Sequence, residues 1–367
     1  MADGDLVDLL SRLVAIDSVN PDLVPGGAGE REIGGFVAEW LERAGLDVAV
    51  DEPAPGRPNV VATARGTGSG RSLLLNAHMD TVGVAGMDAP LEPRVEGGRL
   101  YGRGAYDMKG SLAAIMLAGA AVAQAPLAGD VIVTAVSDEE VASIGTAALA
   151  RSQPADAAIV TEPTELDVAI AHRGFVGFEI ETRGVAAHGS RPDLGEDAIR
   201  KMGPVLVALD ELDQRIQAGE AQPYVGTGSL HASLIEGGQE FSSYPERCLL
   251  TGEWRTLPGQ TTADVERDLR ATAGDADVRL GISRQPFAVS PDEEIVRLVH
   301  ERAGSDLVGV PFWTDAALLA EAGIPTLLFG PAGEGAHAVV EWVELASVER
   351  CRDVLLDVAK SFCGAPS

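Results

Sequence analysis

Basic residues are scarce in this 367-residue chain. It has 28 lysines and arginines against 56 aspartates and glutamates, which gives a formal net charge of −28 at pH 7. A chain this acidic repels nucleic acid and anionic lipid, and it lacks the basic surface that phosphate binding requires. We therefore expect neither a nucleic acid nor a membrane surface as a partner.

Cysteines and aromatic residues are also few. Cys248, Cys351 and Cys363 are widely spaced and form no CxxC pair. This spacing argues against a disulfide framework or a thiolate zinc site, and reduced, buried thiols are typical of a cytoplasmic protein. Aromatic residues make up 4% of the chain and hydrophobic residues 46%, so Ala, Val and Leu must build most of a globular core.

Export signals and membrane spans are not expected. The N-terminal sequence MADGDLVDLLSRLVAIDS has acids where a signal peptide would be basic. One uncharged stretch, residues 110–129, approaches the length of a membrane span, but Ala and Gly dominate it and it contains Ser111, Gln124 and Pro126. A buried core helix is the preferred interpretation.

Strand and helix patterns alternate over residues 1–170 and 288–367. Short apolar runs predict strands at 47–50, 59–64, 72–77, 131–136, 157–161 and 324–330. Helical patterns are found at the N-terminus (Leu6, Leu9, Leu10, Leu13) and at 31–44, 111–124, 145–151, 292–303 and 343–362. Such alternation indicates an α/β sheet covered on both faces.

A different pattern occupies residues 171–287. Strands are predicted in FVGFEIETRG, GSLHASLIEGG, RCLLTGEWRT and DVRLGISRQ, and helices at 195–218 and 262–272, the second opened by a Thr-Thr-Ala-Asp cap. The order β-α-β-β-α-β is that of a ferredoxin-like unit. We therefore predict a small ferredoxin-like domain, 171–287, inserted into a larger α/β domain formed by 1–170 and 288–367.

Histidines and acids follow the predicted strands of the larger domain. In chain order they are His78, Asp80, Asp138, Glu139, Glu140, Glu162 and His337. In open α/β sheets, ligands bind outside the carboxyl ends of the strands, so these groups should meet at one edge. Asp107 is a further candidate, because the glycines of YGRGAYDMKG let the chain bend sharply around it before a helix begins. Those glycines lack the GxGxxG spacing of a nucleotide site.

Acids crowded at one edge repel one another unless a cation compensates. Two imidazoles among carboxylates suit Zn²⁺, and also Co²⁺ or Mn²⁺. The number of acids is sufficient for two ions that share a bridging carboxylate. For any single acid, an ordinary exposed loop position is the alternative, but their convergence on one edge favours a metal site.

The segments NAHMDTV, YGRGAYDMKG, SDEEVASIGT, TEPTEL, AAHGSRPDLGEDAI and GEGAHAVVEWV together resemble the motif set of the M20 metallopeptidases. This family includes acetylornithine deacetylase, succinyl-diaminopimelate desuccinylase, aminoacylase and glutamate carboxypeptidase. The resemblance covers essentially the whole chain in the same order. It implies a zinc-peptidase-like α/β catalytic domain, an inserted lid that also forms a homodimer, and two divalent metal ions.

The resemblance assigns metal ligands to five residues. They are His78, Asp107, Glu140, Glu162 and His337. Asp107 would bridge the two ions, with His78 and Glu162 completing one site and Glu140 and His337 completing the other.

Two acids would act beside the metals. Asp80 would accept a hydrogen bond from the ring of His78 and fix its tautomer, as metal-bound histidines usually require. Glu139 would be the general base and would return the proton to the departing amine. Adjacent residues on an extended backbone point in opposite directions, so Glu140 can face a metal while Glu139 faces the attacking water.

Other residues would bind the substrate. His188, in AAHGSRP, would reach a neighbouring active site across a dimer interface and stabilise the oxyanion. Arg255, in EWRTLPG, would pair with a substrate carboxylate, with a surface salt bridge as the alternative. Thr314 and Asp315 resemble a loop of the substrate pocket.

The implied activity is hydrolysis of the amide bond of an N-acyl amino acid. A metallo-exopeptidase acting on short peptides shares the same chemistry and is the alternative. A catalytically inactive binding protein should lack a ligand or the base, and none is missing. The substrate side chain is not specified, because the asparagine that many relatives carry after the lid's Gly-Gly is replaced here in EGGQEFSSYPERC by Gln239, Ser242, Ser243 and Tyr244.

Overall fold

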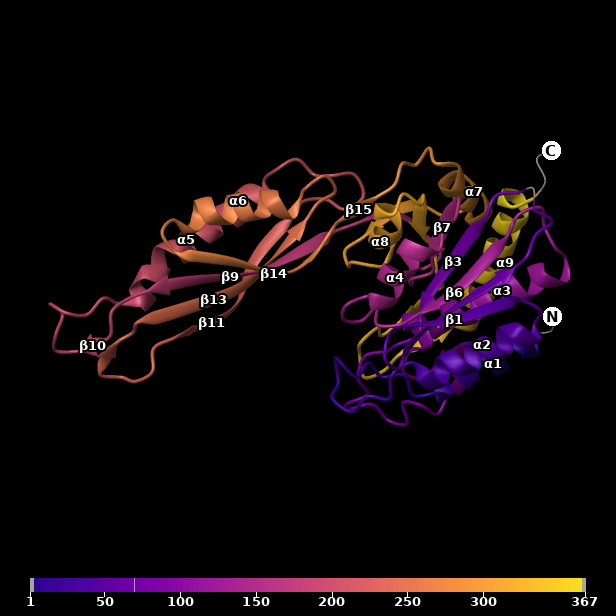
Figure 1. The fold of residues 1–367 in the computed structure, drawn as a ribbon, viewed down its shortest axis with the longest axis horizontal. Coiled ribbons are helices and arrows are strands. Elements are labelled where there is room, and N and C mark those ends of the chain that lie inside the picture. The colour runs from indigo at the N-terminus through magenta and orange to yellow at the C-terminus, as the bar shows by residue number, and fades with distance from the viewer. Residues whose placement is uncertain (1–2, 69, 365–367) are drawn as a thin grey trace. The chain divides into compact units, whose positions relative to one another are not determined.

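The computed structural model describes residues 3–68 and 70–364 and divides into two compact units (Figure 1). The first unit comprises Met1–Ile170, Val289–Val308 and Thr314–Ser367, and the second comprises Ala171–Ala288 and Gly309–Trp313. Residues 288 and 309–313, which the sequence placed in the larger domain, thus group with the smaller one. Residues 1, 2, 69 and 365–367 of the expected larger domain lie outside the described residues.

The first unit contains a mixed sheet with the strand order β1-β2-β6-β3-β7-β17-β8. Its strands are β1 (Asp47–Ala54), β2 (Arg57–Ala64), β3 (Leu73–His78), β6 (Val131–Val136), β7 (Ala157–Val160), β8 (Val168–His172) and β17 (Thr326–Leu328). β3 pairs in parallel with both β6 and β7, and β17 pairs in parallel with β7. The carboxyl ends of these four strands therefore lie at the same edge of the sheet.

Both faces of this sheet are buried, as the apolar runs predict. On one face, Leu73, Leu75 and Ala77 join a core cluster with α1 (Asp3–Ala15), α2 (Arg31–Arg43), α3 (Gly110–Gln124), α7 (Glu294–Ala303) and α9 (Leu345–Phe362). On the other face, Asn76 contacts Thr146 of α4 (Ile144–Ser152), which packs on α8 (Ala316–Glu321). The predicted α/β fold is confirmed. β1 runs four residues beyond its predicted end, because Asp51 and Ala54 still pair with β2 although residues 51–54 have no apolar run.

Helix α3 is the uncharged stretch that resembled a membrane span. It packs against α1 and α9 and on β3 and β6, and nearly all of its residues are buried. Within residues 3–68 and 70–364, no helix is both long and apolar enough to cross a membrane.

A second, small sheet in the first unit was not predicted. Its order is β18-β19-β5-β4, formed by β18 (Gly333–Glu334), β19 (Trp342–Glu344), β5 (Arg99–Tyr101) and β4 (Arg94–Glu96). Trp342 lies opposite Tyr101, so the chain around 99–107 runs beside the chain around 333–344. Strands of two or three residues are too short to leave an alternating sequence pattern.

The second unit is a four-stranded antiparallel sheet with two helices. In chain order the elements are β9 (Gly174–Arg183), α5 (Ala198–Gln217), β11 (Ser229–Gly237), β13 (Arg247–Thr256), α6 (Thr262–Ala273) and β14 (Asp277–Arg284). The sheet order is β11-β13-β9-β14, and the predicted β-α-β-β-α-β sequence is confirmed. Thr261 and Asp264 form the predicted cap of α6, each accepting from the other's backbone N–H. The shorter strands of the second unit are β10 (Ala187–His188), β12 (Ser243–Tyr244) and β15 (Phe287–Ala288). Two further short elements are η1, a π-helix at Ala105–Lys109 in the first unit, and β16 (Leu307–Val310), which pairs with β8.

Candidate metal centre

Parallel strands bring the predicted ligands of the first unit together. His78 is the last residue of β3, and β3 lies between β6 and β7. Glu139 and Glu140 follow the end of β6, and Glu162 follows the end of β7. Because these three strands run in the same direction, their carboxyl ends deliver an imidazole and three carboxylates to one place.

Asp107 lies between the two histidines. Its Oδ1 is 3.1 Å from Nε2 of His78, and its Oδ2 is 3.3 Å from Nε2 of His337. His337 comes from the loop between β18 and β19 and has a left-handed backbone, with φ of +62°. One carboxylate therefore presents a separate oxygen to each imidazole, which is the arrangement that a bridging ligand requires.

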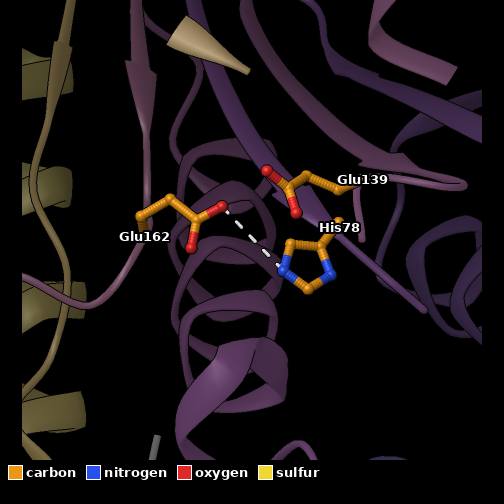
Figure 2. A group of neighbouring side chains, drawn as sticks. All are labelled: His78, Glu139 and Glu162. Atoms are coloured by element: carbon orange, nitrogen blue, oxygen red, sulfur yellow. Dashed lines mark ion pairs between the residues drawn. The ribbon is translucent and has the colours of Figure 1, made fainter. Parts of the chain in front are cut away.

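Each imidazole has a further carboxylate beside it. Glu162 Oε1 lies 3.9 Å from Nε2 of His78, and Glu140 Oε2 lies 3.1 Å from Nε2 of His337. Figure 2 shows the carboxylates of Glu139 and Glu162 turned toward the ring of His78. His78 belongs to two groups of side chains whose ligand atoms lie within 4.8 Å of one another. One group is His78, Glu139 and Glu162, and the other is His78, Asp107 and Glu140. Glu139 thus lies within 4.8 Å of His78, in the same group as the implied ligand Glu162.

The crowding of acids shifts their pKa values. Burial, and then the charge of Glu162, raises the pKa of Glu139 well above its usual range. Burial raises the pKa of Glu162 to about 8. Burial by itself would lower the pKa of His78, but the hydrogen bond to Asp107 and the charges of Glu162 and Glu139 raise it. Buried carboxylates that repel one another in this way are stabilised by a bound cation.

The donor set fits divalent metal ions. Two imidazole nitrogens and several carboxylate oxygens suit Zn²⁺, and they also suit Co²⁺ or Mn²⁺. Oε1 of Glu140 is buried and finds no hydrogen-bond partner among the described residues. A buried acceptor without a donor costs free energy, and a metal ion at this oxygen would remove that cost.

Asp80 contacts His78 differently from the expectation. The ring Nδ1 lies 2.9 Å from the backbone carbonyl of Asp80 and 3.6 Å from its carboxylate. The carboxylate instead accepts the backbone N–H groups of Glu139, at 3.1 Å, and Glu140, at 3.2 Å. Asp80 therefore orients the histidine through its main chain and the two glutamates through its side chain. The turn after β3 faces the turn after β6, which local sequence does not reveal.

Buried residues that the sequence did not mark support Asp80. Nδ2 of Asn20 donates to Asp80, at 2.8 Å, and to Asp138, at 3.0 Å. The guanidinium of Arg57 pairs with Glu30 at 2.6 Å and with Asp138 at 2.9 Å. Asn20 and Arg57 follow no strand end and belong to no motif, so no sequence signal pointed to them.

Thr314 and Asp315 are buried at the start of α8. Thr314 is 0% exposed and Asp315 1%. The Thr314 hydroxyl accepts from the backbone N–H of Ala316 at 3.3 Å, and the Thr146 hydroxyl donates to Asp315 at 2.5 Å. Burial raises the pKa of Asp315 to about 6. These contacts tie α8 to α4, and a role toward substrate stays a prediction.

His188 and Arg255 belong to the second unit. His188 is exposed on β10, with Nδ1 2.8 Å from the hydroxyl of Ser190. Nε of Arg255 lies 2.6 Å from Glu253, and the guanidinium carbon lies 5.3 Å from the centre of the Phe175 ring. The structure therefore does not group either residue with the metal ligands, and their roles in catalysis stay predictions.

The ion pairs of His337 predict a pH dependence for the metal-free protein. Hydrogen bonds to Asp107 and Glu140 raise the pKa of His337 to about 10. Because the folded state favours the protonated ring, this stabilisation is present below the unfolded pKa of about 6.5 and is lost as the pH rises through about 10. In metal-free protein, His337→Gln should lower the Tm at about pH 6, and the difference should shrink toward zero by about pH 10.

Scanning calorimetry at several pH values measures this difference. The effect should be modest, because 57% of the His337 side chain is exposed and water screens the ion pairs. His231→Gln, at an exposed site of the second unit, is the control, and its Tm should depend on pH as that of the wild type does. A difference that grew with pH would contradict the assignment.

Comparison with known proteins identifies the family and agrees with the fold. The sequence profile of peptidase family M20/M25/M40 matches residues 74–361. The chain is 32% identical to an acetylornithine deacetylase of Myxococcus xanthus over 97% of each chain. A tripeptidase of Staphylococcus aureus has a similar structure, with a TM-score of 0.81 and 22% identity over 99% of each chain. A dinuclear metal binding peptidase of Bacillus subtilis gives a TM-score of 0.74 and 17% identity over 98% of each chain.

The protein therefore belongs to the M20/M25/M40 family of peptidases. The match covers most of the chain and includes every predicted ligand and the predicted base, from His78 to His337. Together with the cluster of ligands in the first unit, it makes the protein a metal-dependent amidohydrolase.

Proposed function

We propose that the protein uses two divalent metal ions to hydrolyse the amide bond of an N-acyl amino acid. The observation that carries this proposal is Asp107, whose two oxygens face His78 and His337 separately. His78 and Glu162 would complete one site, and Glu140 and His337 would complete the other. The similarity to an acetylornithine deacetylase favours a small acylated amino acid as the substrate.

The chain's own residues orient the reacting groups. When bound, the two ions supply Lewis-acid polarisation of the scissile carbonyl and lower the pKa of water. Glu139, whose backbone is held by Asp80, takes the proton from the attacking water and delivers it to the departing amine. Burial raises the pKa of Glu139, and a carboxylate of higher pKa is a stronger proton acceptor.

Two residues of the second unit, Arg255 and His188, are proposed to recognise substrate. Arg255 would bind the substrate carboxylate, and Glu253 would orient its guanidinium until the substrate arrives. His188 would come from the partner chain of a homodimer and stabilise the oxyanion. Thr314 and Asp315 would line the pocket near Glu139, with which Asp315 interacts electrostatically.

A substrate panel tests the proposal. Zinc-loaded protein should release the amino acid from acetylornithine, succinyl-diaminopimelate or another N-acyl amino acid, and chelation should stop the reaction. Turnover of dipeptides or tripeptides alone would identify an exopeptidase instead, a reading consistent with the fold shared with the tripeptidase. Unchanged turnover after complete metal removal would reject both activities.

We also propose that the second unit forms the homodimer through β11. This strand is at the edge of its sheet, so one row of its backbone groups has no neighbouring strand within the sheet. Its side chains Leu234 and Ile235 are 64% and 53% exposed. Exposed apolar edge strands readily pair with another chain.

Light scattering after size-exclusion chromatography tests this interface. Leu234→Lys should shift the protein from dimer to monomer, because the charge blocks apolar strand pairing. Ile282→Lys is the matched control, since Ile282 is 63% exposed on β14 at the opposite edge. A dimer that persists in Leu234→Lys, or a wild-type monomer, would contradict the proposal.

A further inference from the structure

Glu341 is a buried carboxylate that has no assigned role. It lies four residues after His337, immediately before β19, and its side chain is 0% exposed. Burying an ionised carboxylate is costly unless donors surround it. The burial of the Glu341 carboxylate is therefore expected to be compensated by hydrogen bonds.

Four donors surround the Glu341 carboxylate. Oε1 accepts the backbone N–H groups of Tyr106, at 2.9 Å, and Asp107, at 3.0 Å. Oε2 accepts the backbone N–H of Gly104, at 2.9 Å, and Nη1 of Arg103, at 2.6 Å. The side chain thus holds the main chain of the loop 103–107 at the residue that carries the shared carboxylate.

Arg103 ties the same loop to two further segments. Its Nη2 donates to the carbonyl of Ala338 at 2.9 Å, and its Nε donates to the carbonyl of Gly83 at 3.2 Å. The loop packs tightly against the segment after β3. Gly104 has φ of +77°, and a Cβ at this position would lie 2.7 Å from Cγ2 of Thr81. The segment after β3, the Asp107 loop and the chain that follows His337 are therefore joined by one buried ion pair.

We propose that Glu341 is a positioning residue that places Asp107 between His78 and His337 and thereby sets the affinity for the metal ions. This inference rests on the proposed dinuclear site. The oxygens of Asp107 lie 3.1 Å and 3.3 Å from the two imidazoles, so a small shift of the Asp107 backbone would spoil the bridge to one ion or both. Groups that orient metal ligands without touching the metal typically change its affinity by about 10- to 100-fold when mutated.

Glu341→Gln tests this role without changing the size of the side chain. The glutamine amide keeps one oxygen, so its nitrogen must face either the Tyr106 and Asp107 donors or the Gly104 and Arg103 donors. Two buried donors then lose their acceptor, and the loop must move. We expect the zinc affinity, measured by competition with a chromogenic chelator, to fall about 10- to 100-fold, and the absorption bands of the Co²⁺-loaded protein to change.

Glu181→Gln is the matched control for a purely structural effect. Glu181 is a buried carboxylate of the second unit that accepts from Arg247 at 2.8 Å and from Arg279 at 3.2 Å. This variant should lower the Tm but keep the zinc affinity and Co²⁺ spectrum of the wild type. A folded Glu341→Gln protein with wild-type affinity and spectrum would overturn the proposal.

Arg103→Lys tests the same positioning role if Glu341→Gln does not fold. Lysine keeps the charge but cannot reach Glu341, Ala338 and Gly83 together. Zinc affinity should again fall, and an unchanged affinity would overturn the proposal. A wild-type protein that binds no metal would instead reject the dinuclear site itself, so the two failures are distinguishable.

Discussion

Glu139→Gln is expected to lower kcat by about 10²–10⁴-fold, the usual contribution of a positioned general base. The amide cannot accept a proton from water, whereas its shape is nearly that of the carboxylate beside His78 and Glu162. Zinc content should remain at the wild-type value, because the implied ligands are His78, Asp107, Glu140, Glu162 and His337. Steady-state kinetics and metal analysis on the same sample measure both quantities.

Glu321→Gln is the control for this experiment. Glu321 is an exposed carboxylate at the end of α8, and its replacement should change neither kcat nor zinc content. Wild-type turnover by Glu139→Gln would remove Glu139 from the mechanism. Zinc loss by this variant would make Glu139 a ligand, which its presence with His78 and Glu162 in one cluster leaves geometrically open.

Asp107→Ala is expected to abolish the dinuclear centre. Both imidazoles lose the carboxylate that faces them, so the zinc content should fall from two ions per chain to one or none. Polarisation of the scissile carbonyl by a metal ion stabilises the transition state by several kcal/mol. Losing the metal centre should therefore lower kcat/KM by about 10³-fold or more. Inductively coupled plasma mass spectrometry and kinetics at a fixed zinc concentration test both expectations.

Two further measurements make the Asp107 result specific. Asp88→Ala, at an exposed site of the first unit, should keep the zinc content and activity of the wild type. Asp107→Ala should still unfold cooperatively, since the core cluster around α3 is unchanged. Retention of two zinc ions by folded Asp107→Ala would contradict the bridging role.

Six strands of the main sheet, and the meeting of the ligands that follow them, could be predicted from the sequence, whereas β8, β15 and β16 were not predicted. The run 131–136 was predicted with the bounds that β6 has, and β3 and β7 were predicted to within one residue at each end. Strands buried on both faces are continuous apolar runs, so composition and length reveal them. Because parallel strands end at one edge, the positions of His78, Glu140 and Glu162 after such runs were sufficient to bring them together.

The contacts that hold those ligands in place are visible only in the folded protein. Asp80 orients Glu139 and Glu140 through its carboxylate, and Glu341 holds the backbone of Asp107 from 234 positions away. A hydrogen bond between a side chain and a distant backbone N–H depends on how loops meet in space. Such a hydrogen bond produces no periodicity or characteristic spacing in the sequence. A buried strand, by contrast, requires apolar side chains at nearly all of its positions, so its sequence reveals it.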